Sequence, residues 1–305
     1  MTAAAAGDAL GAFLDAEIKG SVAASVQMAV EDIRRRLGSS VAAVLFYGSC
    51  LRTGDLAEKV LDFYVLVDGY RALWGRHPLA LANRLIPPNV FYAETRLDDG
   101  LVMRSKYAVL SLPHFERLAS ARTFNASVWA RFAQPCRLVY ARDQEVERRV
   151  AAALAEAVRT MASSVRPLMG ANFSAAELWS CAFRQTYRAE LRSEAADKGR
   201  ELYELDRNRY DALTDMLRGE WQATTAGSQA WCRLSWALRR IQGKILSILR
   251  LVKGTFTFDG GIDYLAWKIS RHSGVKIEIT PWQRRHPLLA GLQLFWRLRR
   301  RGAFR

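Results

Sequence analysis

Three residues near the start of the chain have the types and spacing needed to bind a phosphorylated substrate. Gly48 and Ser49 end a short apolar run, "VAAVLFYGS", and Asp62 lies inside the next one, "VLDFYVLVD". A carboxylate in a half-buried strand is costly unless a cation meets it. A Gly-Ser turn offers N–H groups and a hydroxyl to a phosphate, and glycine lets the phosphate approach closely. Because an acid and a polyphosphate repel each other, the pattern predicts Mg²⁺ between them, held by Asp62.

A strand, a Gly-Ser turn and a second strand carrying Asp are typical of the polymerase-β-like nucleotidyltransferases. That superfamily has a second acid two residues on, on the same strand face, but here the position is Tyr64. Asp68 shares the face, yet six residues of strand place it roughly 20 Å from Asp62. We therefore expect a second metal ligand from the following hairpin, with Glu94 ahead of the two turn aspartates. Two alternatives stay open: an ordinary turn beside an isolated acid, and a fold that binds nucleotide without catalysis.

Short strands and amphipathic helices must position these residues. Residues 41–47, 60–68 and 136–143 predict strands, and "NVFYAETRL" and "LVMRSKYAVLSL" flank a "DDG" turn that predicts a β-hairpin. Apolar residues at three- and four-residue steps predict helices. The predicted helices span 5–36, 144–165, 174–195, 199–219 and 229–253, followed by a short one in the tail.

These elements predict an α/β (α+β) fold in three parts, and 305 residues suffice for them. The parts are a nucleotidyltransferase domain (1–145), a helical domain that is winged-helix-like in one interpretation (146–225), and a basic aromatic segment (226–305). The four cysteines are far apart, which argues against a zinc site or a disulfide framework and favours a reducing compartment. No stretch is long and apolar enough to predict a membrane span, and the first residues lack the pattern of a secretory signal.

The positive charge is concentrated at the end of the sequence. Residues 226–305 hold 16 lysines and arginines against 3 acids, a net of +13 within a total of +15. Bulky apolar residues alternate with arginines there, as in a helix that lies in a lipid headgroup layer, where each basic residue contributes about 1 kcal/mol. The residues expected to contact the membrane are Leu292, Phe295, Trp296, Arg297, Arg299, Arg300 and Arg301.

Other interpretations of the basic segment differ in the partner. Phosphate backbones attract arginine as well as lipids do, and some nucleotidyltransferases act on RNA ends. The sequence contains no recognisable RNA-binding module, and RNA would leave the bulky aliphatic residues in water. Binding to lipid is therefore favoured over binding to nucleic acid. A non-catalytic scaffold on an anionic membrane, and an ordinary solvated basic helix, are the remaining alternatives.

Several stretches, in this order, resemble the mitochondrial translocator-assembly-and-maintenance family of phosphatidate cytidylyltransferases and its bacterial relatives. They are "YGSC", "LDFYVLVD", "NVFYAET", "SKYAVLS", "FNASVWARFAQPCRLV" and "TYRAELR", spanning roughly residues 44 to 192. The family's strand also has Asp followed by an apolar or aromatic residue, which accounts for Tyr64. The matched residues are Gly48, Ser49, Asp62, Asp68, Tyr92, Lys106, Tyr107, Asn125, Arg131, Pro135, Tyr187 and Arg192.

The resemblance implies that CTP and phosphatidate react to give CDP-diacylglycerol and pyrophosphate with Mg²⁺ as cofactor, in phospholipid synthesis. It implies a peripheral enzyme on the cytoplasmic face of the inner membrane. The attacking phosphate monoester has a second pKa of about 6, so it needs no general base. We expect Ser49 to hold the nucleotide phosphates, Lys106 to neutralise the reacting phosphates, and Arg131 and Arg192 to bind anions. In the alternative, Lys106 is a strand-edge lysine, Arg192 pairs along its own helix, and Tyr187 belongs to the core.

Overall fold

The computed structural model describes residues 3–56, 60–75, 77–97, 100–190, 198–221, 227–257 and 279–285. The described strands form one five-stranded sheet in the order β3-β4-β2-β1-β5. The strands are β1 (Val41–Tyr47), β2 (Val60–Val67), β3 (Asn89–Arg96), β4 (Val102–Ser111) and β5 (Cys136–Ala141). All five segments predicted to form strands, including the two arms of the hairpin, are confirmed, since each is a short apolar run bounded by turn residues.

Strand direction and register decide which side chains lie next to one another where β1 ends and β2 begins. β1 pairs antiparallel with β2 and β5, β2 pairs parallel with β4, and β3 and β4 form the predicted antiparallel hairpin. Tyr47 is opposite Asp62, Asp62 is opposite Lys106, and Lys106 is opposite Tyr92. Directly opposed residues point to the same face. One row of four side chains therefore runs across the sheet where β1 ends and β2 begins.

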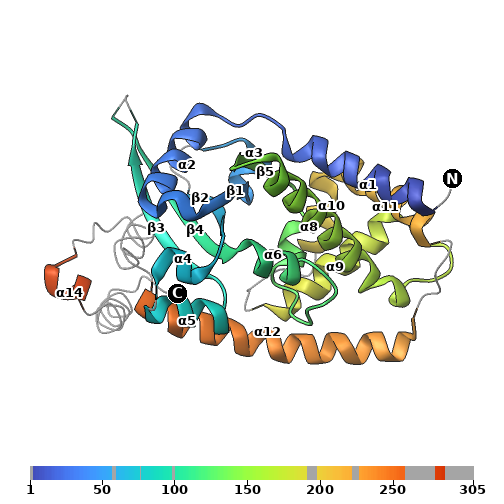
Figure 1. Ribbon diagram of the computed structural model, residues 1–305. Coiled ribbons are helices and arrows are strands. Elements are labelled where there is room, and N and C mark those ends of the chain that lie inside the picture. Colours follow the sequence, from blue (N-terminus) through green and yellow to red (C-terminus); the bar gives the residue numbers. More distant parts are fainter. Residues whose placement is uncertain are drawn as a thin grey trace, which may run out of the picture.

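Helices cover both faces of the sheet (Figure 1). One face packs Phe63 and Val65 against α2 (Ala24–Leu37). The opposite face places Leu45 and Tyr64 in a larger core that continues into the helices after β5. The described helices besides α2 are α1 (Ala3–Ile18), α3 (Ser49–Thr53), α4 (Tyr70–Trp74), α5 (Pro78–Leu85), α6 (Leu112–Leu118), α7 (Trp129–Phe132), α8 (Gln144–Ser163), α9 (Ala175–Ala189), α10 (Lys198–Leu205), α11 (Arg207–Trp221), α12 (Gln229–Thr257) and α14 (Pro281–Arg285), with 3₁₀ turns η1 (Gly38–Ser40) and η2 (Arg166–Leu168).

Two predicted single helices are each two helices, so these predictions were wrong. The segment 5–36 breaks at Gly20, where the chain passes so close to β5 that a Cβ atom would lie 2.5 Å from Nε of Arg137. As a result α1 packs on α8 and α11 while α2 crosses to the opposite sheet face. The segment 199–219 divides between α10 and α11, and Tyr210 on α11 packs against Tyr203 on α10.

Described residues of the sheet and of the helices after it share one hydrophobic core. The cluster that contains Leu45 and Tyr64 of the sheet also contains Val158 of α8, Trp179 of α9 and Trp236 of α12. The sheet and the helices that follow it are therefore packed into one continuous interior.

Helix α12 runs along the molecule from the helical part to the underside of α5 (Figure 1). Its inner face makes polar contacts at both ends: Trp236 donates to the carbonyl of Ser164 at 2.8 Å, and Arg250 donates to the carbonyl of Pro87 at 2.8 Å. Lys253 donates to the carbonyls of Ile86 and Pro88. Because these contacts occupy the inner face, the apolar stripe points outward. Its exposed residues are Trp231, Leu234, Leu238, Ile241, Ile245, Ile248 and Leu249.

Among the described residues, no helix is both long enough and apolar enough to cross a membrane. The four cysteines are all buried free thiols. The tail residues predicted to contact the membrane, from Leu292 to Arg301, lie outside the described residues.

Candidate functional site

A cavity of about 250 Å³ lies where the inner strand β1 ends and its neighbour β2 begins, beside helices α7 and α9. It brings together most of the residues singled out from the sequence. Its lining consists of Tyr47, Gly48, Ser49, Arg52, Asp62, Lys106, Arg131, Gln134, Pro135 and Tyr187. Among the described residues of that lining, Asp62 is the only acid, against Arg52, Lys106 and Arg131, so the described lining carries a net positive charge.

Gly48 allows the chain to turn directly over Asp62. Its φ of 94° lies in the left-handed region that side chains rarely adopt. A Cβ atom at this position would lie 3.0 Å from Oδ2 of Asp62. Glycine is thus required both by the backbone conformation and by the close approach of the carboxylate. Ser49 follows as the first residue of α3 and lines the same cavity.

Asp62 and Lys106 form an ion pair across two parallel strands. Nζ of Lys106 lies 3.0 Å from Oδ1 of Asp62, and both side chains are partly exposed to the cavity. The structure therefore places beside Asp62 the cation that a carboxylate in a half-buried strand requires. Lys106 is not an edge lysine, because β4 lies between β2 and β3.

Arg131 is a half-buried cation held in place by aromatic residues. Its Nη1 donates to the hydroxyl of Tyr64 at 3.0 Å, and its guanidinium lies 5.5 Å from the ring centre of Tyr47. Burial works against its charge, but interactions with Tyr64, Tyr47 and Glu190 outweigh it, so the pKa of Arg131 lies above its ordinary value. The position two residues after Asp62 is therefore occupied by a tyrosine that orients a cation.

Arg52 and Gln134 were not among the residues identified from the sequence. Nη1 of Arg52 donates to Oε1 of Gln134 at 3.2 Å, and the amide of Gln134 donates to the carbonyl of Ala130 at 3.1 Å. Arg52 stands one helical turn after Ser49, and this spacing was the available signal for a second cation near the Gly-Ser turn. Gln134 gave no such signal, because its place depends on how α7 packs against the sheet.

Glu94 and Asp68 are not brought to Asp62. Glu94 lies on β3, two strands away from β2, and is engaged by the hydroxyl of Tyr92 at 2.7 Å and by Arg104 at 3.5 Å. Two strand spacings amount to about 10 Å, too far for a shared metal ion. Asp68 pairs with Arg142 at 2.7 Å at the far end of β2. Neither acid completes a metal shell around Asp62 in this arrangement.

The remaining predicted residues have different outcomes. Tyr187 belongs both to the core and to the site, since it packs against the main hydrophobic cluster and also lines the cavity. Arg192 lies outside the described residues, so its role stays a prediction. Within the described ranges, no group of three or more His, Cys, Asp or Glu side chains is placed to hold a metal ion.

The donor set around Asp62 suits one type of metal site. Mg²⁺ keeps several waters and is commonly bound by one or two carboxylates together with substrate phosphates. A single carboxylate, close to the Gly48 turn and the Ser49 side chain, fits a Mg²⁺ ion that arrives with a nucleotide. It does not fit a cage made of protein ligands alone.

No protein-family model matches the chain. No curated protein matches it either.

Proposed function

We propose that this protein is a peripheral, Mg²⁺-dependent phosphatidate cytidylyltransferase that converts CTP and phosphatidate to CDP-diacylglycerol and pyrophosphate. The observation that carries the proposal is the Asp62 cavity, where one carboxylate faces a Gly-Ser turn and three cations. Such a site suits a reaction whose barrier is lowered by positioning and charge neutralisation. The choice of CTP and phosphatidate as substrates comes from the family resemblance in residues 44 to 192. The charged groups that line the cavity are of the kind that this reaction needs.

The proposed reaction assigns one role to each part of the lining. A phosphate oxygen of phosphatidate bonds to the α-phosphorus of CTP, and the bond to the bridging oxygen breaks to release pyrophosphate. Ser49 would hold the outer phosphates, and Arg131 and Arg52 would neutralise the negative charge of the pyrophosphate. Lys106 would move from its ion pair with Asp62 to the incoming phosphate. No described histidine lines the cavity, which agrees with a nucleophile that is already ionised.

In this proposal Asp62 is the residue that would hold Mg²⁺. When bound, the ion would screen the triphosphate from Asp62 and neutralise charge on the departing pyrophosphate. Its remaining ligands would come from nucleotide phosphates and water, because Glu94 and Asp68 are paired elsewhere.

The outer face of α12 supports the membrane-bound part of the proposal. Its exposed apolar residues recur at steps of three and four from Trp231 to Leu249, about five helical turns, and include Trp231 and Ile241, each at least 60% exposed. Leu81 and Leu85 of neighbouring α5 are exposed as well. A lipid headgroup layer would cover these residues, while RNA would leave them in water. The face thus favours lipid over the rival substrate, an RNA end.

A substrate panel tests the proposal directly. The full chain is incubated with each labelled nucleoside triphosphate, phosphatidate, Mg²⁺ and detergent, and in parallel with RNA in place of lipid. We expect a labelled lipid product from CTP alone, and none with EDTA or with the Asp62→Asn variant. Labelled RNA would move the assignment to the rival class. Binding to anionic vesicles without any product would leave a non-catalytic scaffold.

A further inference from the structure

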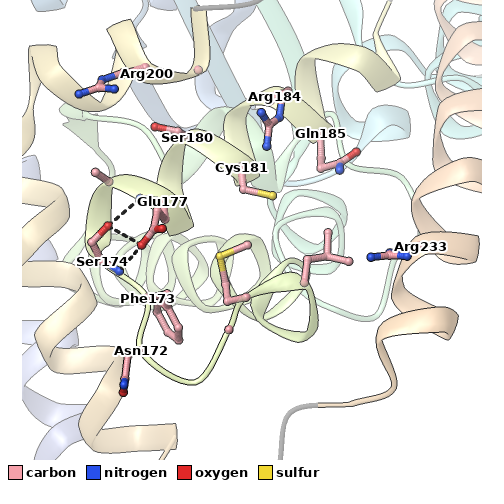
Figure 2. Close-up of a pocket in the computed structure, with 15 residues that line it drawn as sticks. Asn172, Phe173, Ser174, Glu177, Ser180, Cys181, Arg184, Gln185, Arg200 and Arg233 are labelled. Carbon is pink, nitrogen blue, oxygen red and sulfur yellow. Dashed lines mark hydrogen bonds between the residues drawn. The ribbon is translucent and has the colours of Figure 1, made fainter.

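A second cavity, of about 850 Å³, lies in the helical part between α9, α10, the loop after η2 and the start of α12 (Figure 2). It shares no lining residue with the Asp62 cavity. Its volume is within the 300–1,000 Å³ range of small-molecule sites. The reaction proposed above uses none of its residues.

The described lining of the cavity is cationic, and the one acid in it, Glu177, is already engaged. Arg184 of α9 and Arg233 of α12 both extend toward the hollow from opposite walls (Figure 2). Neither has a carboxylate within ion-pair distance among the described residues, whereas Arg200 lies 3.8 Å from Glu204. Glu177 accepts from both the backbone N–H and the hydroxyl of Ser174 at 2.8 Å, which lowers the pKa of its carboxyl group.

Gln185, a residue of the lining, has a buried oxygen, Oε1, that lacks a partner among the described residues. A buried acceptor left without a donor costs about 1–3 kcal/mol. Gln185 follows Arg184 directly and lies between the two arginines in Figure 2. A ligand with a hydroxyl next to its anionic group would supply the missing donor.

The floor of the cavity is apolar. It consists of Leu168 at the end of η2 together with Met169 and Phe173 of the loop that leads to α9. A free inorganic anion would make no use of this surface. The lining therefore suits a small amphipathic molecule, with its anionic end at the arginines and its carbon backbone on the loop.

We propose that this cavity binds the phosphate ester of a polyol, as found in glycerol phosphate and in the headgroups of glycerophospholipids. The two guanidinium groups grip the phosphate oxygens, which match their paired N–H groups. A hydroxyl of the polyol donates to Gln185, and the carbon backbone covers Met169. The proposal is independent of the cytidylyltransferase assignment, since it concerns a different cavity.

The test measures binding to the full chain by calorimetry, with sn-glycerol 3-phosphate and short-chain phosphatidylglycerol as the two probes. Phosphatidylglycerol is a phosphodiester, so it cannot act as the nucleophile of the proposed reaction. We expect at least one probe to bind, and its Kd to rise at least tenfold in Arg184→Gln and in Arg233→Gln. The matched control is Arg188→Gln, which removes an exposed arginine of the same helix outside the cavity. That variant should bind within twofold of wild type.

Further variants assign the bound probe to a cavity and to a source. Lys106→Met should leave binding intact, and Gln185→Leu should weaken glycerol phosphate but not inorganic phosphate. Tighter binding of phosphatidylglycerol would identify a lipid headgroup as the source, and tighter binding of glycerol phosphate a soluble ester. Absence of binding by both probes, or equal binding in all arginine variants, would overturn the proposal. Loss only in Lys106→Met would also overturn it, because the probe would then occupy the Asp62 cavity.

Discussion

Nζ of Lys106 lies 3.0 Å from Oδ1 of Asp62, and the two residues are opposite each other on adjacent parallel strands. The hydrogen-bonded ladder of β2 and β4 fixes their separation, so little side-chain freedom is needed to bring the charges together. The carboxylate is therefore oriented before any ligand arrives. Each group is also partly exposed to the cavity, which leaves both able to take a second partner.

The first prediction concerns Asp62. Asp62→Asn removes the charge that would hold Mg²⁺ but changes little volume, so turnover should be lost while the fold remains. The partner Lys106 is about one-third exposed, and losing such a pair costs no more than about 1 kcal/mol of stability. Steady-state kinetics and thermal unfolding check the two parts. Asp68→Asn, which breaks a surface pair with Arg142, is the matched control and should retain activity. A kcat above one tenth of wild type in Asp62→Asn would contradict the metal assignment.

The second prediction compares Ser49 with Lys106. Ser49→Ala should weaken nucleotide use by the ~1–3 kcal/mol of a charge-assisted hydrogen bond. Lys106→Met should cost more, because it removes a full charge from the place where phosphates gather and leaves Asp62 without its cation. The kcat/KM for CTP ranks the two variants. Unchanged kinetics in Lys106→Met would contradict the catalytic role and leave Lys106 only as the ion-pair partner of Asp62.

The third prediction concerns the hydroxyl of Tyr64, which holds Arg131. Tyr64→Phe keeps the ring packed on Phe132 and removes only the group that accepts from the guanidinium. Since a hydrogen bond to a charged group contributes about 1.5–3 kcal/mol, kcat/KM should fall at least tenfold. The control is Tyr203→Phe, which loses a hydroxyl bonded to Asp211, neither residue being part of the cavity lining. Equal kinetics in the two variants would show that Arg131 needs no orientation for its role.

The fourth prediction separates two candidate membrane contacts. Deleting residues 284–305 removes seven arginines, and it should weaken binding to anionic vesicles and reduce its salt dependence. Replacing Trp231, Leu238 and Ile245 of α12 by Ser should weaken binding by removing apolar surface, with the salt dependence retained. Vesicle sedimentation at several salt concentrations checks both effects.

Leu101→Ser is the control for the serine variants, because Leu101 is 64% exposed in the β3–β4 turn, away from α12. Both changes should reduce activity on membrane-embedded phosphatidate and spare a short-chain soluble phosphatidate. Equal loss on the two substrates would mean that the altered segment supports the catalytic cavity instead of the membrane contact.

The fifth prediction concerns pH and His114. Burial, followed by the charge of Arg117, lowers the pKa of His114 from 6.5 to about 4. The guanidinium of Arg117 can only donate to Nε2, so Nδ1 carries the proton and donates to Tyr70. At pH values between these two pKa values, His114 is protonated in the unfolded chain but stays neutral in the folded chain. Stability should therefore be full above about pH 6.5 and fall as the pH drops toward 4.

The His114→Gln variant lacks this titration, so its unfolding free energy should change less across the same interval. Urea unfolding at several pH values between 7.5 and 4.5 measures the two slopes. Identical slopes for wild type and variant would show that His114 is protonated without penalty.

The parts of the fold that depend on local pattern could be predicted from the sequence. Strands β1 and β2 are short apolar runs between turn residues, and the "DDG" turn gave the hairpin. The pairing of Asp62 with Lys106 could not be predicted. It depends on β4, and not β3, being inserted beside β2 with a parallel register, which no local pattern specifies.

The periodic pattern of apolar residues could not predict which face of α12 is buried. A stripe of Leu and Ile at helical spacing normally faces the core. Here Arg250 and Lys253 turn inward because backbone carbonyls from residue 86 to 88 are available to receive them. The sequence identifies two faces of this helix, and only tertiary contacts decide which of them is buried.

Gly243 has a mechanical consequence. At this residue α12 lies so close to the end of α9 that a Cβ atom would be 2.0 Å from the carbonyl oxygen of Ala189. Ala189 is two residues beyond Tyr187, which lines the Asp62 cavity. The crossing presses one turn of this 29-residue helix against the end of α9. Even a methyl group at position 243 would force the two helices apart, next to the wall of the Asp62 cavity.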